Sequence, residues 1–474
     1  MSRWNLAWLL AVPALVALGL AASFSAPPPD KDYQLVRTIV DVLAEVDKNY
    51  VRELTDAEKK KLVEEMINGG LERLDPHSQY FNEDDLAVFE TQSEGQFGGV
   101  GIMLAKDPLT PYLKVDAPMP GTPAYEAGIQ ANDLITKVKS EAGEKSTENM
   151  RIDEVRKLIV GQPGTPVTLT IVHEGSTKEE DVTLTRAVIV QHPVQGIARD
   201  PADPTKWVFM ADKENKIAYV RLTGFSEKSD KELRAAVEQA EKDGARGLVL
   251  DLRDNPGGLL NQAVAIADLF LNEGTIVSTR DRNGGGRKWV AKPENTLFEP
   301  ADKKPIAVLV NRYSASASEI VASALQDNKR AVVIGERSYG KGSVQKVFNL
   351  PDRKAAVKLT TETWLTPAGK NIHRWPTSKE TDEWGVKPDA GFEVKLTDEQ
   401  RREYVTHQLS LDRIRGKPGT KDGNGNGKDD KNKDKTEKAA KPYKDPVLDK
   451  ALDYLRGKVK EVGAAGLAER RVAA

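Results

Sequence analysis

The sequence predicts a multidomain α+β protein with helical regions at both ends of a sheet-containing middle. Three observations predict this fold class. The chain has 474 residues, of which 39% are hydrophobic, enough for two or three domains. Short apolar runs alternate with helical patterns between residues 186 and 415, as is typical of a layered α/β unit. A polar stretch at residues 416–442 separates that unit from a last helical pattern.

Composition excludes several classes of function. The net charge of −2 gives no sign of a nucleic-acid-binding protein. The chain has no cysteine, which excludes disulfides, thiol nucleophiles and thiolate metal sites. The five histidines are scattered and show no metal-binding spacing. We therefore expect no metal site, no cofactor and no nucleic-acid partner.

Residues 1–26 are expected to be a membrane anchor or a signal segment. The run from Trp4 to Phe24 is uncharged and mostly apolar, and as a helix it would span about 31 Å, enough for the bilayer core. Gly19-Leu-Ala and Ser23-Phe-Ser also fit a loose cleavage site, so both interpretations stay open. With Arg3 kept inside, we expect the rest of the chain to be extracytoplasmic, meaning periplasmic. It is anchored if the segment is retained and soluble if it is cleaved.

Residues 27–89 are expected to form a helical region after the stiff Pro27-Pro-Pro spacer. Apolar residues recur at helical spacing from Tyr33 to Asn49, and Thr55-Asp-Ala-Glu begins a second pattern that runs to Leu74. Such an amphipathic pair can pack on the core or form a homodimer, and both outcomes stay open.

Residues 90–180 carry the motifs of a small sheet domain. In chain order these are Gly98-Gly-Val-Gly-Ile-Met, Thr122-Pro-Ala-Tyr-Glu-Ala-Gly-Ile, Asn132-Asp-Leu-Ile, a helix at Ile152–Val160 and a strand at Val167–Val172. In this order they resemble a PDZ domain, which binds a peptide by adding it as a strand to an exposed sheet edge. The resemblance implies that loop amides receive the terminal carboxylate of the peptide. The loop residues are Gly98, Gly99, Val100, Gly101 and Ile102.

Residues 186–415 are expected to form the layered α/β unit. Its candidate strands are Ile217–Leu222, Gly247–Leu252, Ile306–Val310 and Ala331–Ile334. Its most informative segment is Ser314-Ala-Ser-Ala-Ser-Glu-Ile, between the third strand and a helix. Ser316 and Glu319 have the spacing of a capping box, which is a structural role. A serine at a helix N-terminus also suits nucleophilic attack, because helix N–H groups favour an oxyanion nearby.

Lys341, between Gly340 and Gly342, is a candidate base for such a serine. A free lysine titrates near ~10.4, and burial without a carboxylate partner can lower this by up to ~3–5 units. An ordinary surface lysine is the structural alternative. The segment from Gly335 nearly spells a P-loop, but Gly342 replaces its Ser/Thr and a strand pattern follows instead of a helix. We therefore reject a phosphate-binding loop.

The segment from Asn311 to Gln345 resembles the catalytic segment of the carboxyl-terminal processing, or tail-specific, proteases. In that family the middle serine of Ser-Ala-Ser-Ala-Ser-Glu-Ile is the nucleophile, and the lysine of Gly-Lys-Gly-Ser-Val-Gln is the base. The resemblance implies Ser316 as nucleophile, Lys341 as base and Gln345 as the residue that orients the lysine. It also implies a crotonase-like protease core. The residues alone leave Ser314, Ser316 and Ser318 open as nucleophiles.

The run Asp251-Leu-Arg-Asp-Asn-Pro-Gly-Gly matches the glycine-rich turn of the same family. The resemblance implies an oxyanion hole made by backbone amides of Gly257, Gly258 and Ala317. A plain strand-to-helix turn is the structural alternative, because Asn-Pro-Gly-Gly forms turns in any case.

Two further motifs match the family, and one position departs from it. Leu74-Asp-Pro-His-Ser-Gln-Tyr and Trp384-Gly-Val-Lys-Pro-Asp are the matches, and His77 in the first is expected to be structural. The departure is Val160, because relatives often carry an arginine directly before the following Gly-x-x-Gly-Thr. In some relatives that arginine helps couple the PDZ domain to the active site. Such coupling would need a substitute here, for which Arg156 is a candidate.

Residues 416–442 are expected to be a disordered linker, and residues 443–474 a helical tail. The Asp-Gly-Asn-Gly-Asn-Gly stretch of the linker suggests calcium. An EF-hand loop needs a glutamate at its last position and flanking helices, and neither is evident here, so the pattern does not favour a calcium site.

These features predict an exported serine endopeptidase. It would bind unstructured, apolar C-terminal tails of extracytoplasmic proteins in the PDZ groove and cut within them by acyl-enzyme chemistry. The alternative is a noncatalytic binding or scaffold protein on the same fold. An unrelated transport-associated PDZ scaffold would leave the Ser-Lys segment unexplained. The sequence does not identify the substrate, an adaptor, or the direction of any PDZ control.

Overall fold

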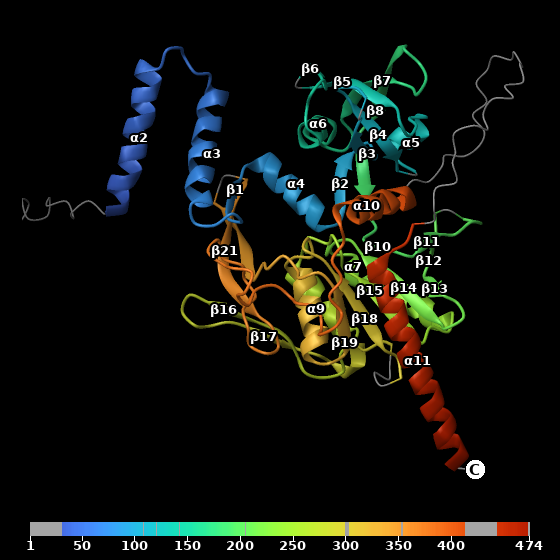
Figure 1. The fold of residues 1–474 in the computed structure, drawn as a ribbon. Coiled ribbons are helices and arrows are strands. Elements are labelled where there is room, and N and C mark those ends of the chain that lie inside the picture. The colour runs from blue at the N-terminus through green and yellow to red at the C-terminus, as the bar shows by residue number, and fades with distance from the viewer. Residues whose placement is uncertain are drawn as a thin grey trace, which may run out of the picture. The chain divides into compact units, whose positions relative to one another are not determined.

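The computed structural model describes residues 31–107, 109–119, 121–141, 143–203, 205–298, 303–351, 354–412 and 443–472 (Figure 1). The expectations for residues 1–26 and 416–442 lie outside the described residues. The chain divides into two compact units, Met1–Pro76 and His77–Ala474. Within the described ranges, no helix is long and apolar enough to cross a membrane.

The first unit contains two helices, α2 (Lys31–Asn49) and α3 (Asp56–Glu72). Helix α3 begins with a capping box, in which Thr55 and Glu58 each accept a hydrogen bond from the backbone N–H of the other. Helix α2 leaves a row of apolar side chains exposed. These are Leu35, Val36, Ile39, Val40 and Val42, between 48% and 67% exposed.

The N-terminal part of the second unit contains a six-stranded sheet of order β3-β4-β5-β7-β8, in which β6 also pairs with β5. The elements in this part of the chain are β1 (Gln79–Phe81), α4 (Glu83–Ser93), β2 (Gln96–Gly99), β3 (Ile102–Lys106), β4 (Leu113–Pro118), α5 (Pro123–Glu126), β5 (Leu134–Ser140), β6 (Gly143–Ser146), α6 (Ile152–Ile159), β7 (Pro166–Val172), β8 (Glu179–Thr185) and β9 (Ala187–Val190). Strands β2 and β9 form a separate antiparallel ribbon. Val155 and Ile159 of α6 pack into the core of the six-stranded sheet.

A second six-stranded sheet, of order β10-β14-β15-β18-β19 with β13 on β14, forms the centre of the following part. Its elements are β10 (Val194–Gln195), β13 (Met210–Asp212), β14 (Ile217–Leu222), β15 (Gly247–Asp251), β18 (Ile306–Val310) and β19 (Ala331–Gly335). Strands β14, β15, β18 and β19 are parallel neighbours. Every residue of β14, β15 and β18 is buried, as expected for parallel strands covered on both faces.

Helices cover both faces of this parallel sheet. One face carries α7 (Ser229–Lys242), α8 (Leu260–Asp268) and α9 (Ala317–Asp327), and their apolar side chains share one core with the strands. The other face carries the first part of α11 (Pro446–Val472), and Figure 1 shows the rest of this helix extending beyond the sheet. The candidate strands predicted from sequence agree with these strands to within one residue. The expected α/β layering is confirmed.

A five-stranded sheet of order β1-β21-β16-β17, in which β20 also pairs with β21, a two-stranded ribbon and one helix complete the unit. The remaining elements are β11 (Ala198–Arg199), β12 (Trp207–Val208), β16 (Thr275–Asp281), β17 (Lys288–Val290), the 3-10 turn Pro293–Asn295, β20 (Ser343–Leu350), β21 (Ala355–Leu365) and α10 (Asp398–Asp412). Strand β21 pairs with β1, β16 and β20. Because β20 follows Gly342 as a strand, the rejection of a P-loop is confirmed.

Candidate active site

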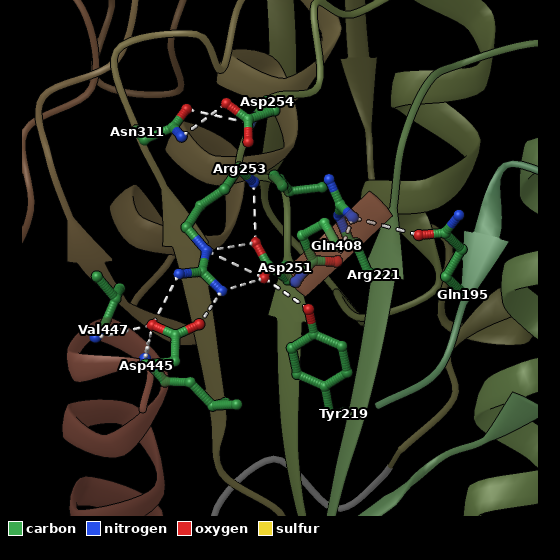
Figure 2. A network of polar contacts seen from close by, with 12 residues as sticks. Gln195, Tyr219, Arg221, Asp251, Arg253, Asp254, Asn311, Gln408, Asp445 and Val447 are labelled. Carbon is green, nitrogen blue, oxygen red and sulfur yellow. Dashed lines mark hydrogen bonds and ion pairs between the residues drawn. The ribbon is translucent and has the colours of Figure 1, made fainter. Parts of the chain in front are cut away.

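Two turns that follow neighbouring parallel strands meet at the carboxyl edge of the sheet. Strands β15 and β18 are parallel, so the chain leaves both at the same edge. The Asn311 side chain accepts the N–H of Asp254 at 3.1 Å and donates to its carboxylate at 3.0 Å (Figure 2). The N–H of Ala315 donates to the carbonyl of Asn255 at 3.0 Å. These bonds hold the Asn-Pro-Gly-Gly turn against the serine-rich segment.

The three serines left open by the sequence have different surroundings. Ser314 and Ser318 are fully buried. Their hydroxyls donate to the carbonyls of Leu252 and Asn255 at 2.8 and 2.9 Å, so each one fixes the turn after β15. Ser316, between them, is partly exposed at the start of α9. The geometry therefore favours Ser316 as the serine that a substrate could reach.

Ser316 has an unusual backbone conformation, with φ 55° and ψ −112°. A non-glycine residue held in such a region costs on the order of 1–3 kcal/mol, and the surrounding structure must hold it there. Gly257 lies directly against it. An added Cβ on Gly257 would stand 2.8 Å from the Ser316 Cβ and 2.9 Å from the backbone nitrogen of Ala317. Only glycine fits at this contact.

The expected oxyanion amides are differently engaged. The N–H of Gly257 already donates to the Asn255 side chain at 2.9 Å. Gly258 lies opposite Phe225 in an isolated β-bridge. The two hydrogen bonds of this bridge are made by its neighbours, since the Gly257 carbonyl accepts from Phe225 and the Leu259 N–H donates to Phe225. The N–H of Gly258 itself therefore points away from Phe225. Among the hydrogen bonds of the described residues, the N–H groups of Gly258 and Ala317 have no acceptor. These two amides, rather than Gly257, can receive a substrate oxygen.

Lys341 lies between β19 and β20, in a loop that needs glycine on both sides. A Cβ on Gly340 would stand 2.8 Å from that of Arg374, and one on Gly342 would stand 2.8 Å from the backbone nitrogen of His373. The flanking glycines thus allow the chain around residues 373–374 to pass close to the lysine loop. Lys341 itself is partly exposed.

Glu319 connects the serine to the lysine loop. Its fully buried carboxylate accepts four hydrogen bonds. Ser338 Oγ and Gly340 N–H donate to Oε1 at 2.5 and 2.6 Å. Ser316 N–H and Lys341 N–H both donate to Oε2 at 2.8 Å. The backbone nitrogens of these two residues can therefore be no farther apart than two such hydrogen bonds.

The sequence pointed to only half of this arrangement. Ser316 and Glu319 have the spacing of a capping box, but nothing local to that motif indicates that Glu319 also binds residues 338–341. Burial raises the pKa of Glu319, while its four hydrogen bonds act in the opposite direction.

Gln345 and His77 also lie in this region. Gln345 is on β20, where its side-chain nitrogen donates to Ser343 and Thr360, each at 3.0 Å.

A cavity of about 680 Å³ opens beside Lys341. Its lining includes His77, Pro256, Tyr313, Ala315, Tyr339, Lys341 and, from α10, Arg401 and Tyr404. His77, which was expected to be structural, therefore borders the same cavity as the lysine. Nowhere in the described chain do three or more His, Asp or Glu side chains gather as a metal site would require.

The PDZ-like loop is shaped by two close approaches. A Cβ on Gly98 would stand 2.1 Å from the carbonyl oxygen of Gly161, and Gly101, at φ 77°, is packed on Thr122. The carbonyls of Val100 and Gly101 accept hydrogen bonds, and no described residue accepts one from their N–H groups. These are the loop amides that a carboxylate could use.

The arginine that contacts the turn after Val160 is Arg186 rather than Arg156. Its buried guanidinium donates to the carbonyls of Leu158, Ile159 and Pro166 and to the Thr165 hydroxyl. It therefore caps the C-terminal end of α6, where carbonyl groups lack intrahelical partners. Burial lowers the pKa of Arg186.

Comparison with known proteins places these features in a family. The profile of peptidase family S41 matches residues 216–391, and a PDZ-domain profile matches residues 114–172. A carboxy-terminal-processing protease of Bartonella bacilliformis is 36% identical, over 84% of this chain and 83% of its own. A carboxyl-terminal-processing protease of Synechocystis is 34% identical, over 72% and 74%. A solved photosystem II D1 C-terminal processing protease is 29% identical, over 75% and 86%, with a TM-score of 0.42.

Proposed function

Because this chain belongs to peptidase family S41 and is a serine-type C-terminal processing protease, we propose that Ser316 and Lys341 form its catalytic dyad. The observation that carries this proposal is the shared Glu319 oxygen, which holds the backbones of both residues at one point. The burial of Ser314 and Ser318 supports the choice of nucleophile.

The proposed reaction passes through an acyl-enzyme. Ser316 Oγ attacks the scissile carbonyl carbon while a neutral Lys341 takes the hydroxyl proton. The amides of Gly258 and Ala317 donate to the oxyanion of the tetrahedral intermediate. Collapse breaks the peptide bond, and Lys341 gives its proton to the departing amine. Lys341 then activates the water that releases the acyl group, and the role proposed for Gln345 is to orient the lysine.

The proposed substrates are proteins with unstructured, apolar C-terminal tails. The PDZ domain is the module that would capture such a tail, with its terminal carboxylate at the loop around Val100 and Gly101. The similarity to processing proteases over most of the chain supports the catalytic function over the noncatalytic alternative.

We further propose an extracytoplasmic location and a homodimer. The apolar run at residues 4–24 supports export, with anchoring if that segment is retained. The exposed apolar row on α2 supports self-association through the first unit. Sedimentation of the purified wild type and of Ile39→Glu tests the homodimer. If both proteins sediment as monomers, the homodimer is refuted.

Cleavage by serine variants tests the dyad. A folded reporter protein with an unstructured apolar tail is incubated with the wild type, Ser316→Ala or Lys341→Ala, and its new termini are mapped by mass spectrometry. Both variants should lose cleavage while keeping the wild-type melting temperature. Ser323→Ala is the matched control, because its hydroxyl bonds only to the Ile320 carbonyl on the same helix. Wild-type cleavage by Ser316→Ala would remove the assignment.

A further inference from the structure

A buried ionic network lies beneath the turn that carries the proposed oxyanion amide. Arg253 is 1% exposed and stands between two carboxylates (Figure 2). One is Asp251, two residues earlier, which receives bonds from Arg253 Nε and Nη2. The other is Asp445, whose two oxygens accept from Nη1 at 3.0 Å and Nη2 at 2.8 Å. Arg253 is thus held by a forked pair from each side.

Asp445 comes from a separate part of the chain. It precedes α11 and lies beyond residues 413–442. Its Oδ1 accepts the N–H groups of Val447 and Leu448 at 3.1 Å, so the same carboxylate that binds Arg253 also caps α11. The apolar face of the helix fixes its place on the sheet. That face consists of Val447, Ala451, Leu452 and Leu455, packed in one core with β14, β15, β18 and β19.

The position of Arg253 bears directly on the turn. Asp254, the next residue, has φ 59° and leads into Asn255-Pro-Gly-Gly. Its carboxylate is bound by Asn311 and by Arg401 of α10. Without Asp445, Arg253 would keep its bonds to Asp251, but donors on its other edge would be buried without an acceptor. The buried guanidinium would then have to shift, and the start of the turn would shift with it.

We propose that Asp445 is a positioning residue for catalysis, delivered by the C-terminal segment 443–472 to fix the turn that holds the Gly258 amide. This inference rests on the proposed function, because it is the oxyanion at Ser316 that the turn would serve. Asp445 is buried and does not line the cavity beside Lys341, so in this proposal it acts through Arg253. Docking of α11 therefore becomes a condition for full activity, although the helix packs on the sheet rather than at the cleavage site.

The test compares Asp445→Asn with Asp453→Asn in the full-length protein. The asparagine at 445 keeps the size and a capping oxygen but offers Arg253 only one acceptor. Asp453 is the matched control on the same helix, 73% exposed and paired only with Arg456 three residues on. For Asp445→Asn we expect kcat to fall roughly 10- to 100-fold, as for a small misplacement of catalytic groups, with KM within about twofold of wild type. Amide exchange of residues 253–259 should speed up in this variant alone.

The outcomes separate this inference from the proposed function. Unchanged kcat and unchanged exchange in Asp445→Asn, beside an active wild type, would overturn the inference and leave the dyad intact. A fall in kcat without faster exchange in residues 253–259 would overturn the positioning role. If wild type does not cleave at all, the proposed function fails, while exchange still reports whether Asp445 holds the turn. If Asp445→Asn shows no melting transition, Asp445→Glu is tested instead. This variant keeps the negative charge and should restore slow amide exchange of residues 253–259. Failure of that rescue counts against the inference.

Discussion

Replacing Glu319 by glutamine should weaken the site in a way that can be calculated from its four donors. A glutamine keeps one oxygen and presents an NH₂ group in place of the other. If the NH₂ faced Ser316 and Lys341, two backbone N–H groups would lose their acceptor. If it faces Ser338 and Gly340, the Ser338 hydroxyl can rotate to accept, and only the Gly340 N–H is orphaned. We expect the second orientation, at a cost of about 1–3 kcal/mol.

Glu319→Ala leaves all four donors without an acceptor and should cost at least twice as much. In a domain of about 150–250 residues each kcal/mol corresponds to about 2–4 °C in melting temperature, and the shift is smaller in a larger cooperative unit. Activity should follow the same order, because the glutamine oxygen still holds both Ser316 and Lys341 while alanine holds neither. The expected ranking of kcat is wild type, then Glu319→Gln, then Glu319→Ala with no measurable cleavage.

The pH dependence gives an independent check on Glu319. Burial raises its pKa in the folded state despite the opposing hydrogen bonds. The stability that this shift contributes is therefore present below the pKa of an unfolded glutamate and is lost as pH rises through the folded value. The wild-type lead in stability over Glu319→Gln should shrink as pH rises.

Calorimetry across pH and steady-state cleavage are the assays for these variants. Glu383→Gln is the control, because this side chain is exposed and paired with Lys370. It should change neither the melting temperature nor kcat. Wild-type kcat in Glu319→Ala would refute the idea that one carboxylate holds the two catalytic backbones. A stability lead that grows with pH would refute the expected direction of its titration.

Three further results are expected. The value of kcat/KM should rise with pH through an apparent pKa below that of a free lysine, because the base must be neutral; a profile that is flat from pH 6 to 10 would contradict a lysine base. EDTA should leave cleavage unchanged, since serine-lysine chemistry needs no metal; inhibition reversed by zinc would point to another mechanism. Amidating the substrate C-terminus should reduce kcat/KM at least several-fold, because a charge-assisted hydrogen bond contributes roughly 1.5–3 kcal/mol. Equal cleavage of amidated and free-acid peptides well below saturation would refute capture by the PDZ loop.

Apolar runs and hydrophobic periodicity in the sequence predicted the strands and helices whose formation depends mainly on nearby residues. Strands β14, β15 and β18 are covered on both faces, so their sequences are mostly apolar, and the sequence places them to within one residue. Helix α6, expected at Ile152–Val160, is found at Ile152–Ile159. The strand at β20 followed from the alternation after Gly342 and decided correctly against a phosphate loop.

The site contacts that were missed join residues far apart in the chain. Ser314 and Ser318 resemble Ser316 until the carbonyls of Leu252 and Asn255, more than 60 residues away, occupy their hydroxyls. Glu319 looks like a simple helix cap because its other donors come from residues 338–341. No periodicity or spacing connects Arg253 to Asp445, 192 residues later. Such pairings depend on the order of strands in the sheet, which a single sequence does not specify.

Covalent trapping at the serine tests the central claim most directly. The wild type is treated with a fluorophosphonate or a slowly deacylating ester, and the modified peptide is sequenced by mass spectrometry. We expect one adduct, on Ser316, absent in Ser316→Ala and formed much more slowly in Lys341→Ala, with tail cleavage lost in proportion. An adduct on Ser314 or Ser318, or tail cleavage that persists after Ser316 is fully modified, would contradict the account.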